Sequence, residues 1–162
     1  MAIQLDVPST VTAGSLNATK LTTTGNSSSL SSLFTNASEV TNVSAIAANG
    51  TINFDFATQS VLYYTTNAAS NWTVNFRNSS GTQVNTALAV GQSVTAVFAV
   101  SQGATAYFAN AHQIDGVSVT PKWQGGSAPT GGNASGVDIY TYTIVKTAAS
   151  TYSVFASQTQ FA

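Results

Sequence analysis

From residue 51 onward, hydrophobic and polar residues alternate along the chain with a period of two. Residues 70–77 carry Trp72, Val74 and Phe76 on one face and polar residues on the other, and residues 51–57 repeat this pattern. Alternation over four to eight residues is typical of a β-strand with one buried face. The pattern therefore predicts strands here, with Trp72 in the core.

The same reading predicts seven or eight strands in the second part of the chain. The further segments are residues 60–66, 92–100, 104–109, 117–120, 137–145 and 151–157. The turn at 101–103 contains glycine and predicts a hairpin between 92–100 and 104–109, and residues 146–150 predict a second hairpin. Asp115-Gly116 predicts a tight turn. The fold class expected is all-β, an antiparallel β-sandwich that is jelly-roll-like.

Residues 1–50 differ from residues 51–162 in composition. Phe34 is the one aromatic residue of the first part, which contains runs of serine and threonine and few apolar side chains. Such a segment buries little by itself. We expect residues 1–50 to form an extended N-terminal arm or stalk for attachment or oligomerisation, with a short strand at 3–7, and residues 51–162 to form the head domain. A floppy terminus is the open alternative.

The chain contains few charged residues. Four Lys and Arg and five Asp and Glu give a net charge of −1, and only 6% of residues are charged, where about 25% is usual. Four scattered cations cannot form a phosphate-binding surface, so we expect no nucleic-acid partner. There is no cysteine, no signal-peptide pattern at the N-terminus and no apolar run long enough to span a membrane, so we expect no membrane partner.

No constellation of residues predicts catalysis, a metal site or a cofactor. His112 is the single histidine, and it stands near Asp115 without a recognisable nucleophile. The other candidate acids for glycoside cleavage are Glu39, Asp55 and Asp138, and none of them has a recognisable spacing. Asp138 alternates with apolar neighbours, which predicts a solvent-facing position. One histidine and dispersed acids do not form a zinc or calcium site, so we expect a non-enzymatic protein.

The aromatic residues suggest a contact surface. Tyr and Trp are common at interfaces because they combine apolar area with a polar group, and their rings also stack on sugars. The candidate surface-contact residues are Trp123, Lys122, His112 and Tyr64. For Trp123, which precedes a glycine-rich loop, core packing and surface contact both stay open.

The sequence VTPKWQGGSAP at 119–129 resembles a known group of proteins, the virion structural proteins of marine tailed phages. The resemblance is to the fibre-like and tail-fibre-like proteins of cyanophages, and it involves about two-thirds of the chain, from residue 51 onward. The other segments that carry it are residues 53–56, 63–67, 103–107, 132–136, 137–146 and 156–161. No active-site residue is carried over.

The resemblance implies a structural component of a phage virion: a fibre, a tail part or a capsid decoration. Fibre proteins are commonly homotrimers with extended N-terminal parts, so the partners implied are other copies of this chain and further virion proteins bound through residues 1–50. Phage proteins assemble in the host cytoplasm, which implies a location in the virion without a signal peptide. Contact with a host glycan stays open. The alternatives are a carbohydrate-binding or adhesin module and a hydrolase.

Overall fold

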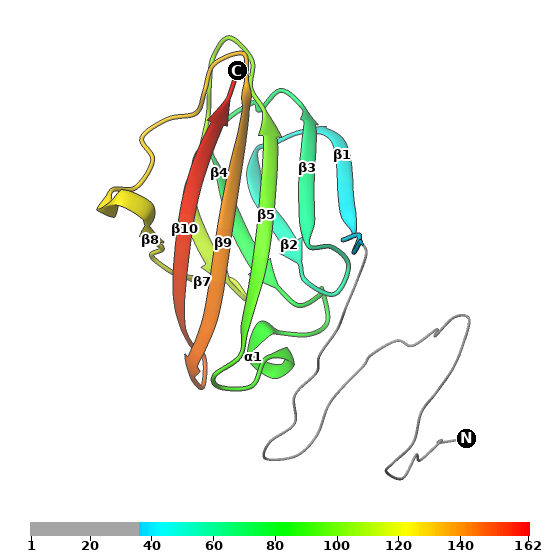
Figure 1. Cartoon of the computed structure of the whole chain (residues 1–162), viewed down its shortest axis with the longest axis vertical. Helices are drawn as coiled ribbons and strands as arrows, with labels where there is room; N and C mark the ends of the chain where they lie inside the picture. The colour runs from blue at the N-terminus through cyan, green and yellow to red at the C-terminus, as the bar shows by residue number, and fades with distance from the viewer. Residues whose placement is uncertain (1–35) are drawn as a thin grey trace, which may run out of the picture. The chain divides into compact units, whose positions relative to one another are not determined.

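Two mixed β-sheets make up the part of the chain that the computed structural model describes, residues 36–162 (Figure 1). The six-stranded sheet has the order β1 (Thr41–Ala47), β3 (Val61–Thr66), β5 (Ser93–Ser101), β9 (Val137–Ala148), β10 (Thr151–Phe161) and β8 (Lys122–Trp123). The four-stranded sheet has the order β2 (Gly50–Asp55), β4 (Trp72–Arg77), β6 (Ala109–Ile114) and β7 (Val117–Ser118). The all-β class predicted from the sequence is confirmed.

Helical structure in residues 36–162 is confined to two short elements. These are α1 (Val84–Ala87), which lies at one end of the sheets in Figure 1, and the 3-10 turn η1 (Gln124–Gly126). Neither is long and apolar enough to cross a membrane.

The first six strands alternate between the two sheets, so the chain coils through both layers. As a result β1 lies parallel to β3, and β3 lies parallel to β5. In the other sheet β2, β4 and β6 are also parallel neighbours, and β8 is parallel to β10. Antiparallel pairs occur only between β5 and β9, β9 and β10, and β6 and β7 within the described residues. The sequence pattern predicted an antiparallel sandwich, and the parallel pairs correct that prediction.

One of the two predicted hairpins is present. β9 and β10 pair along their whole length, from Thr151 opposite Ala148 to Phe161 opposite Val137. The other prediction, a hairpin between residues 92–100 and 104–109, was wrong, because β5 and β6 belong to different sheets. The Asp115-Gly116 turn is confirmed: both residues have positive φ, 53° and 81°, as a two-residue hairpin turn of type I′ requires.

The inner faces of the two sheets pack against each other through aromatic side chains. The ring of Trp72 lies 5.7 Å from that of Phe98 in the opposite sheet, and the ring of Phe76 lies 4.9 Å from that of Tyr142. All four side chains are buried. Complete burial of one such side chain stabilises the fold by about 1.5–3 kcal/mol. The alternation of residues 70–77 thus correctly predicted which side chains of β4 contribute to the core.

The folded domain begins before residue 51. Residues 41–47 form β1, which pairs with β3, and β2 starts at Gly50. The compact unit comprises Ser38–Ala162. Residues 38–50 therefore belong to this compact unit and not to the predicted arm. The remaining part of the arm prediction, residues 1–35, and the strand predicted at 3–7 lie outside the described residues.

Candidate functional site

Two of the four candidate contact residues are buried. Tyr64 is 8% exposed, and its ring packs 5.4 Å from that of Phe98. His112 is 6% exposed, and its Nε2 lies 3.0 Å from the hydroxyl of Tyr142. Burial lowers the pKa of His112 to about 4. Both side chains point into the layer between the sheets because of the strand alternation, which corrects their prediction as surface residues.

Lys122 and Trp123 are neighbours on β8 and point to opposite faces of the six-stranded sheet. Lys122 is exposed on the outer face, where its Nζ lies 5.5 Å from the centre of the Phe155 ring. Trp123 is half-buried at the sheet edge, with its ring 5.5 Å from that of His112. For Trp123 the structure therefore combines the two roles left open by the sequence: partial packing in the core and partial exposure.

These two residues lie at a groove of about 320 Å³ on β8, β9 and β10. Across the three strands, Thr143 stands beside Phe155, which stands beside Lys122. Two residues along, Thr141 stands beside Ser157. The groove thus has an aromatic ring and an ammonium group next to a floor of hydroxyl groups. Phe155 was not among the residues predicted from the sequence, although a large aromatic residue out of phase with inward-facing Val154 and Ala156 is a signal for it.

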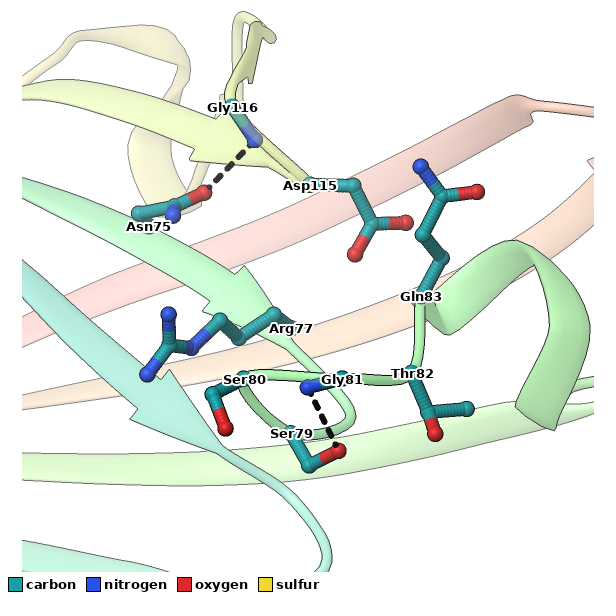
Figure 2. Close-up of a pocket in the computed structure, with 9 residues that line it drawn as sticks. All are labelled: Asn75, Arg77, Ser79, Ser80, Gly81, Thr82, Gln83, Asp115 and Gly116. Atoms are coloured by element: carbon teal, nitrogen blue, oxygen red, sulfur yellow. Dashed lines mark hydrogen bonds between the residues drawn. The ribbon is translucent and has the colours of Figure 1, made fainter.

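A second cleft of about 320 Å³ lies at one end of the four-stranded sheet, where β4, the loop before α1 and the β6–β7 turn meet (Figure 2). Its polar groups largely bind one another. Asp115 accepts hydrogen bonds from the backbone N–H groups of Val84 at 3.0 Å and Asn85 at 3.4 Å, the first turn of α1. The side-chain oxygen of Asn75 accepts one from Gly116 N–H at 2.9 Å. Asp115 therefore acts as a structural cap.

Two other polar side chains also support the fold. Arg77 in this cleft pairs with Asp55 on the neighbouring strand β2. Lys146 is buried, and its Nζ donates hydrogen bonds to the carbonyl oxygens of Asn85 at 2.6 Å and Leu88 at 2.8 Å, so it holds the C-terminal end of α1. The two Lys146 contacts satisfy carbonyl groups that the C-terminal end of a short helix leaves without partners.

Asp138 is fully buried, so the prediction of a solvent-facing position was wrong. Its carboxylate accepts hydrogen bonds from Gln102 Nε2 at 2.8 Å and from the backbone N–H of Asn133 at 3.1 Å. Burial raises the pKa of this carboxyl, against the opposing effect of the hydrogen bonds. Asp138 thus ties the glycine-rich loop before β9 to the end of β5. Among residues 36–162 there is no group of three or more His, Asp or Glu side chains that could hold a metal ion.

The outer face of the six-stranded sheet carries very little charge. The six strands contain three charged residues, Lys122, Asp138 and Lys146, and the last two are buried on the inner face. A row of apolar side chains crosses the outer face from strand to strand. This apolar row consists of Val43, Tyr63, Ala99 and Ile139. Val43 is 62% exposed, Tyr63 and Ile139 are half-buried, and Ala99 is 7% exposed.

Comparison with known proteins adds no relative. No family model matches the chain, and neither does any curated protein or solved structure. The function must therefore be inferred from the residues themselves.

Proposed function

We propose that this protein is a non-enzymatic structural subunit of a tailed-phage virion. It assembles with copies of itself, as a homotrimer, and forms a fibre, a tail part or a capsid decoration. In this proposal the part of the predicted arm that precedes the folded domain, residues 1–37, attaches to other virion proteins, and the protein is assembled in the host cytoplasm. The resemblance of residues 119–129 and the segments around them to phage virion proteins supports it.

The observation that carries the proposal is the outer face of the six-stranded sheet, on which Lys122 is the one charged side chain of the strands. The centres of protein interfaces are depleted in charge, and exposed apolar patches mark contact sites. The apolar row begins at Val43 on β1, which is an edge strand among the described residues, and edge strands offer backbone groups for pairing. A face of this kind suits association with other copies of the chain.

The contacts of three of the four candidate acids, all but the exposed Glu39, favour a structural role over hydrolysis. A glycosidase needs two carboxyl groups on either side of one bond, with one of them accessible to water or substrate. Asp115 is occupied by the N–H groups of α1, Asp55 by Arg77, and Asp138 by Gln102 and Asn133.

Mass spectrometry of purified particles tests the virion assignment. We expect the protein to be detected in particles at a stoichiometric level, and a density map of the particle then assigns it to tail or capsid. Particles that lack the protein would overturn the assignment.

Light scattering of the purified chain at micromolar concentration tests self-association. We expect the mass of three chains, and we expect Val43→Asp to raise the dissociation constant at least about tenfold, because the new carboxylate loses water without gaining a partner. The matched control is Val117→Asp on β7, where the valine is 69% exposed. A monomeric wild type, or equal behaviour of the two variants, would contradict this part of the proposal.

A further inference from the structure

We infer that the groove on β8, β9 and β10 binds an anionic sugar unit, one that carries a carboxylate or a sulfate group. The inference rests on the side chains of this groove and not on the assembly proposed above. The apolar row starts on β1, at the opposite edge of the same sheet.

The first requirement of a sugar site is an exposed aromatic ring. Phe155 is 48% exposed and points outward from β10 beside the groove floor. One face of a sugar ring consists of C–H groups, which pack on the face of an aromatic ring and lose water with it. Phe155 provides this surface.

The second requirement is a set of hydrogen-bonding groups that are not already used. Thr141, Thr143, Ser157 and Gln124 line the groove, and their side chains form no hydrogen bond to other residues of the described part of the chain. A hydroxyl group both donates and accepts, as the hydroxyl groups of a sugar do, and an amide supplies both functions from separate atoms. The groove floor therefore matches the polar edge of a sugar.

The sign of the ligand's charge follows from Lys122. Within residues 36–162 it is the one cationic side chain that is both exposed and free of an ion pair, because Arg77 pairs with Asp55 and Lys146 is buried. The Phe155 ring attracts the ammonium group at 5.5 Å and so keeps it at the groove. An ammonium group binds a carboxylate or sulfate through a charge-assisted hydrogen bond.

The cleft in Figure 2 has the same volume, about 320 Å³, so size does not distinguish the two sites. They differ in chemistry. In the cleft, Asp115, Asn75 and Arg77 are engaged with other groups of the chain, and no aromatic side chain lines the walls. The groove offers the opposite combination, a ring and unengaged polar groups.

Isothermal titration calorimetry with the full chain tests the inference. The probes are tetragalacturonate, a sulfated carrageenan tetrasaccharide, neutral maltotetraose and tetraglutamate. We expect at least one anionic tetrasaccharide to bind about tenfold more tightly than maltotetraose, and its binding to weaken as salt is raised. The tighter of the two identifies the anion. Equal binding of maltotetraose would overturn the anionic preference, and equal binding of tetraglutamate would overturn the assignment to a sugar.

Two variants locate the site. Lys122→Gln is expected to weaken binding of the anionic sugar about tenfold and to leave that of maltotetraose unchanged, since one charge-assisted hydrogen bond is lost. Phe155→Ala is expected to weaken binding of both. Its matched control is Phe161→Ala, because Phe161 lies on the same strand, outside the groove, and is 49% exposed. Unchanged affinity in Lys122→Gln, or equal effects of the two phenylalanine variants, would overturn the inference.

Tryptophan fluorescence provides a second readout of the same site. Trp72 is 1% exposed, and Trp123 follows Lys122 on β8 with its ring on the inner face, so a change on ligand binding reports on β8 through the surroundings of Trp123. We expect this change with the anionic sugar in Val43→Asp as well as in the wild type. Failure of assembly and failure of sugar binding are thereby separated.

Discussion

His112 of the four-stranded sheet lies with its Nε2 3.0 Å from the hydroxyl of Tyr142 in the six-stranded sheet, so this polar contact bridges the two layers of the core. Burial lowers the pKa of His112 to about 4 and raises the pKa of Tyr142 well above its ordinary value. Both groups are therefore neutral at pH 7, and the contact joins two uncharged side chains.

The first prediction is that acid weakens the fold through His112. Above pH 6.5 this side chain is neutral in the folded and unfolded states. Between pH 6.5 and about 4 the unfolded chain takes up a proton that the folded chain does not, so stability falls as the pH is lowered. The loss amounts to about 3 kcal/mol over this range. Urea unfolding at pH 7 and pH 4 measures it.

The control for this prediction is His112→Gln, which replaces the imidazole with an amide that does not titrate. We expect a flatter dependence of stability on pH for this variant. If wild type and variant lose stability equally between pH 7 and pH 4, another group is responsible.

The second prediction is that protonation of Asp138 at low pH stabilises the fold, which is opposite to the effect of His112. Burial raises the pKa of its carboxyl, so the folded state binds a proton more tightly than the unfolded state does. Its contribution to stability is present at low pH and is lost as the pH rises through the folded pKa. Asp138→Asn removes this contribution, and we expect that variant to lose more stability than wild type between pH 7 and pH 4. A shallower loss in the same urea titration would contradict the prediction.

Gly132 is predicted to be intolerant of any side chain. A Cβ atom there would lie 2.6 Å from Asp138 Oδ2 and 2.8 Å from Gln102 Nε2, and it would also collide with the carbonyl oxygen of Tyr107. We expect Gly132→Ala to cost about 1–3 kcal/mol in the free energy of unfolding, since the loop must shift away from the buried carboxylate. Gly131→Ala is the matched control, because a Cβ there meets nothing within 4 Å. Equal stabilities of the two variants would exclude this tight packing.

Asp115 is predicted to matter for stability through α1. Asp115→Ala removes the acceptor for the N–H groups of Val84 and Asn85, and loss of such a cap costs about 1 kcal/mol. Ser80→Ala, in the same cleft, serves as the control since the Ser80 side chain forms no hydrogen bond to another described residue. Thermal unfolding of both variants measures the difference, and an unaffected Asp115→Ala would show that α1 does not need the cap.

The positions of most strands could be predicted from the sequence, but the pairing of the strands within the sheets could not. Alternation determines which side of a strand is buried, and it correctly turned Trp72, Val74 and Phe76 inward. It contains no information about which sheet a strand joins. The turn at 101–103 was therefore interpreted as a hairpin, whereas the chain crosses there between β5 and β6 of different sheets. The crossovers depend on contacts between residues far apart in the sequence.

The candidate site was predicted in part for the same reason. Lys122 and Trp123 were singled out from their local sequence, and both line the groove. Phe155 joins them only because β8 lies beside β10, a pairing between segments about thirty residues apart. Asp138 was assigned to the surface because it alternates with the apolar residues Val137 and Ile139, yet these two lie on the outer face and Asp138 on the inner one. Its contacts with Gln102 and Asn133 could not be predicted from the sequence, because they depend on the pairing of β5 with β9.

The position of β9 in the middle of the six-stranded sheet has a consequence during protein synthesis. β5 pairs with β9 on one side and β10 pairs with it on the other, yet β9 and β10 leave the ribosome after every other strand of the described domain. Until then β5 has an open edge. Tyr140 and Tyr142 of β9 are not yet present to cover the rings of Phe98, Trp72 and Phe76. Translation speed and chaperones thus act on a nascent chain whose core closes only when its last hairpin arrives.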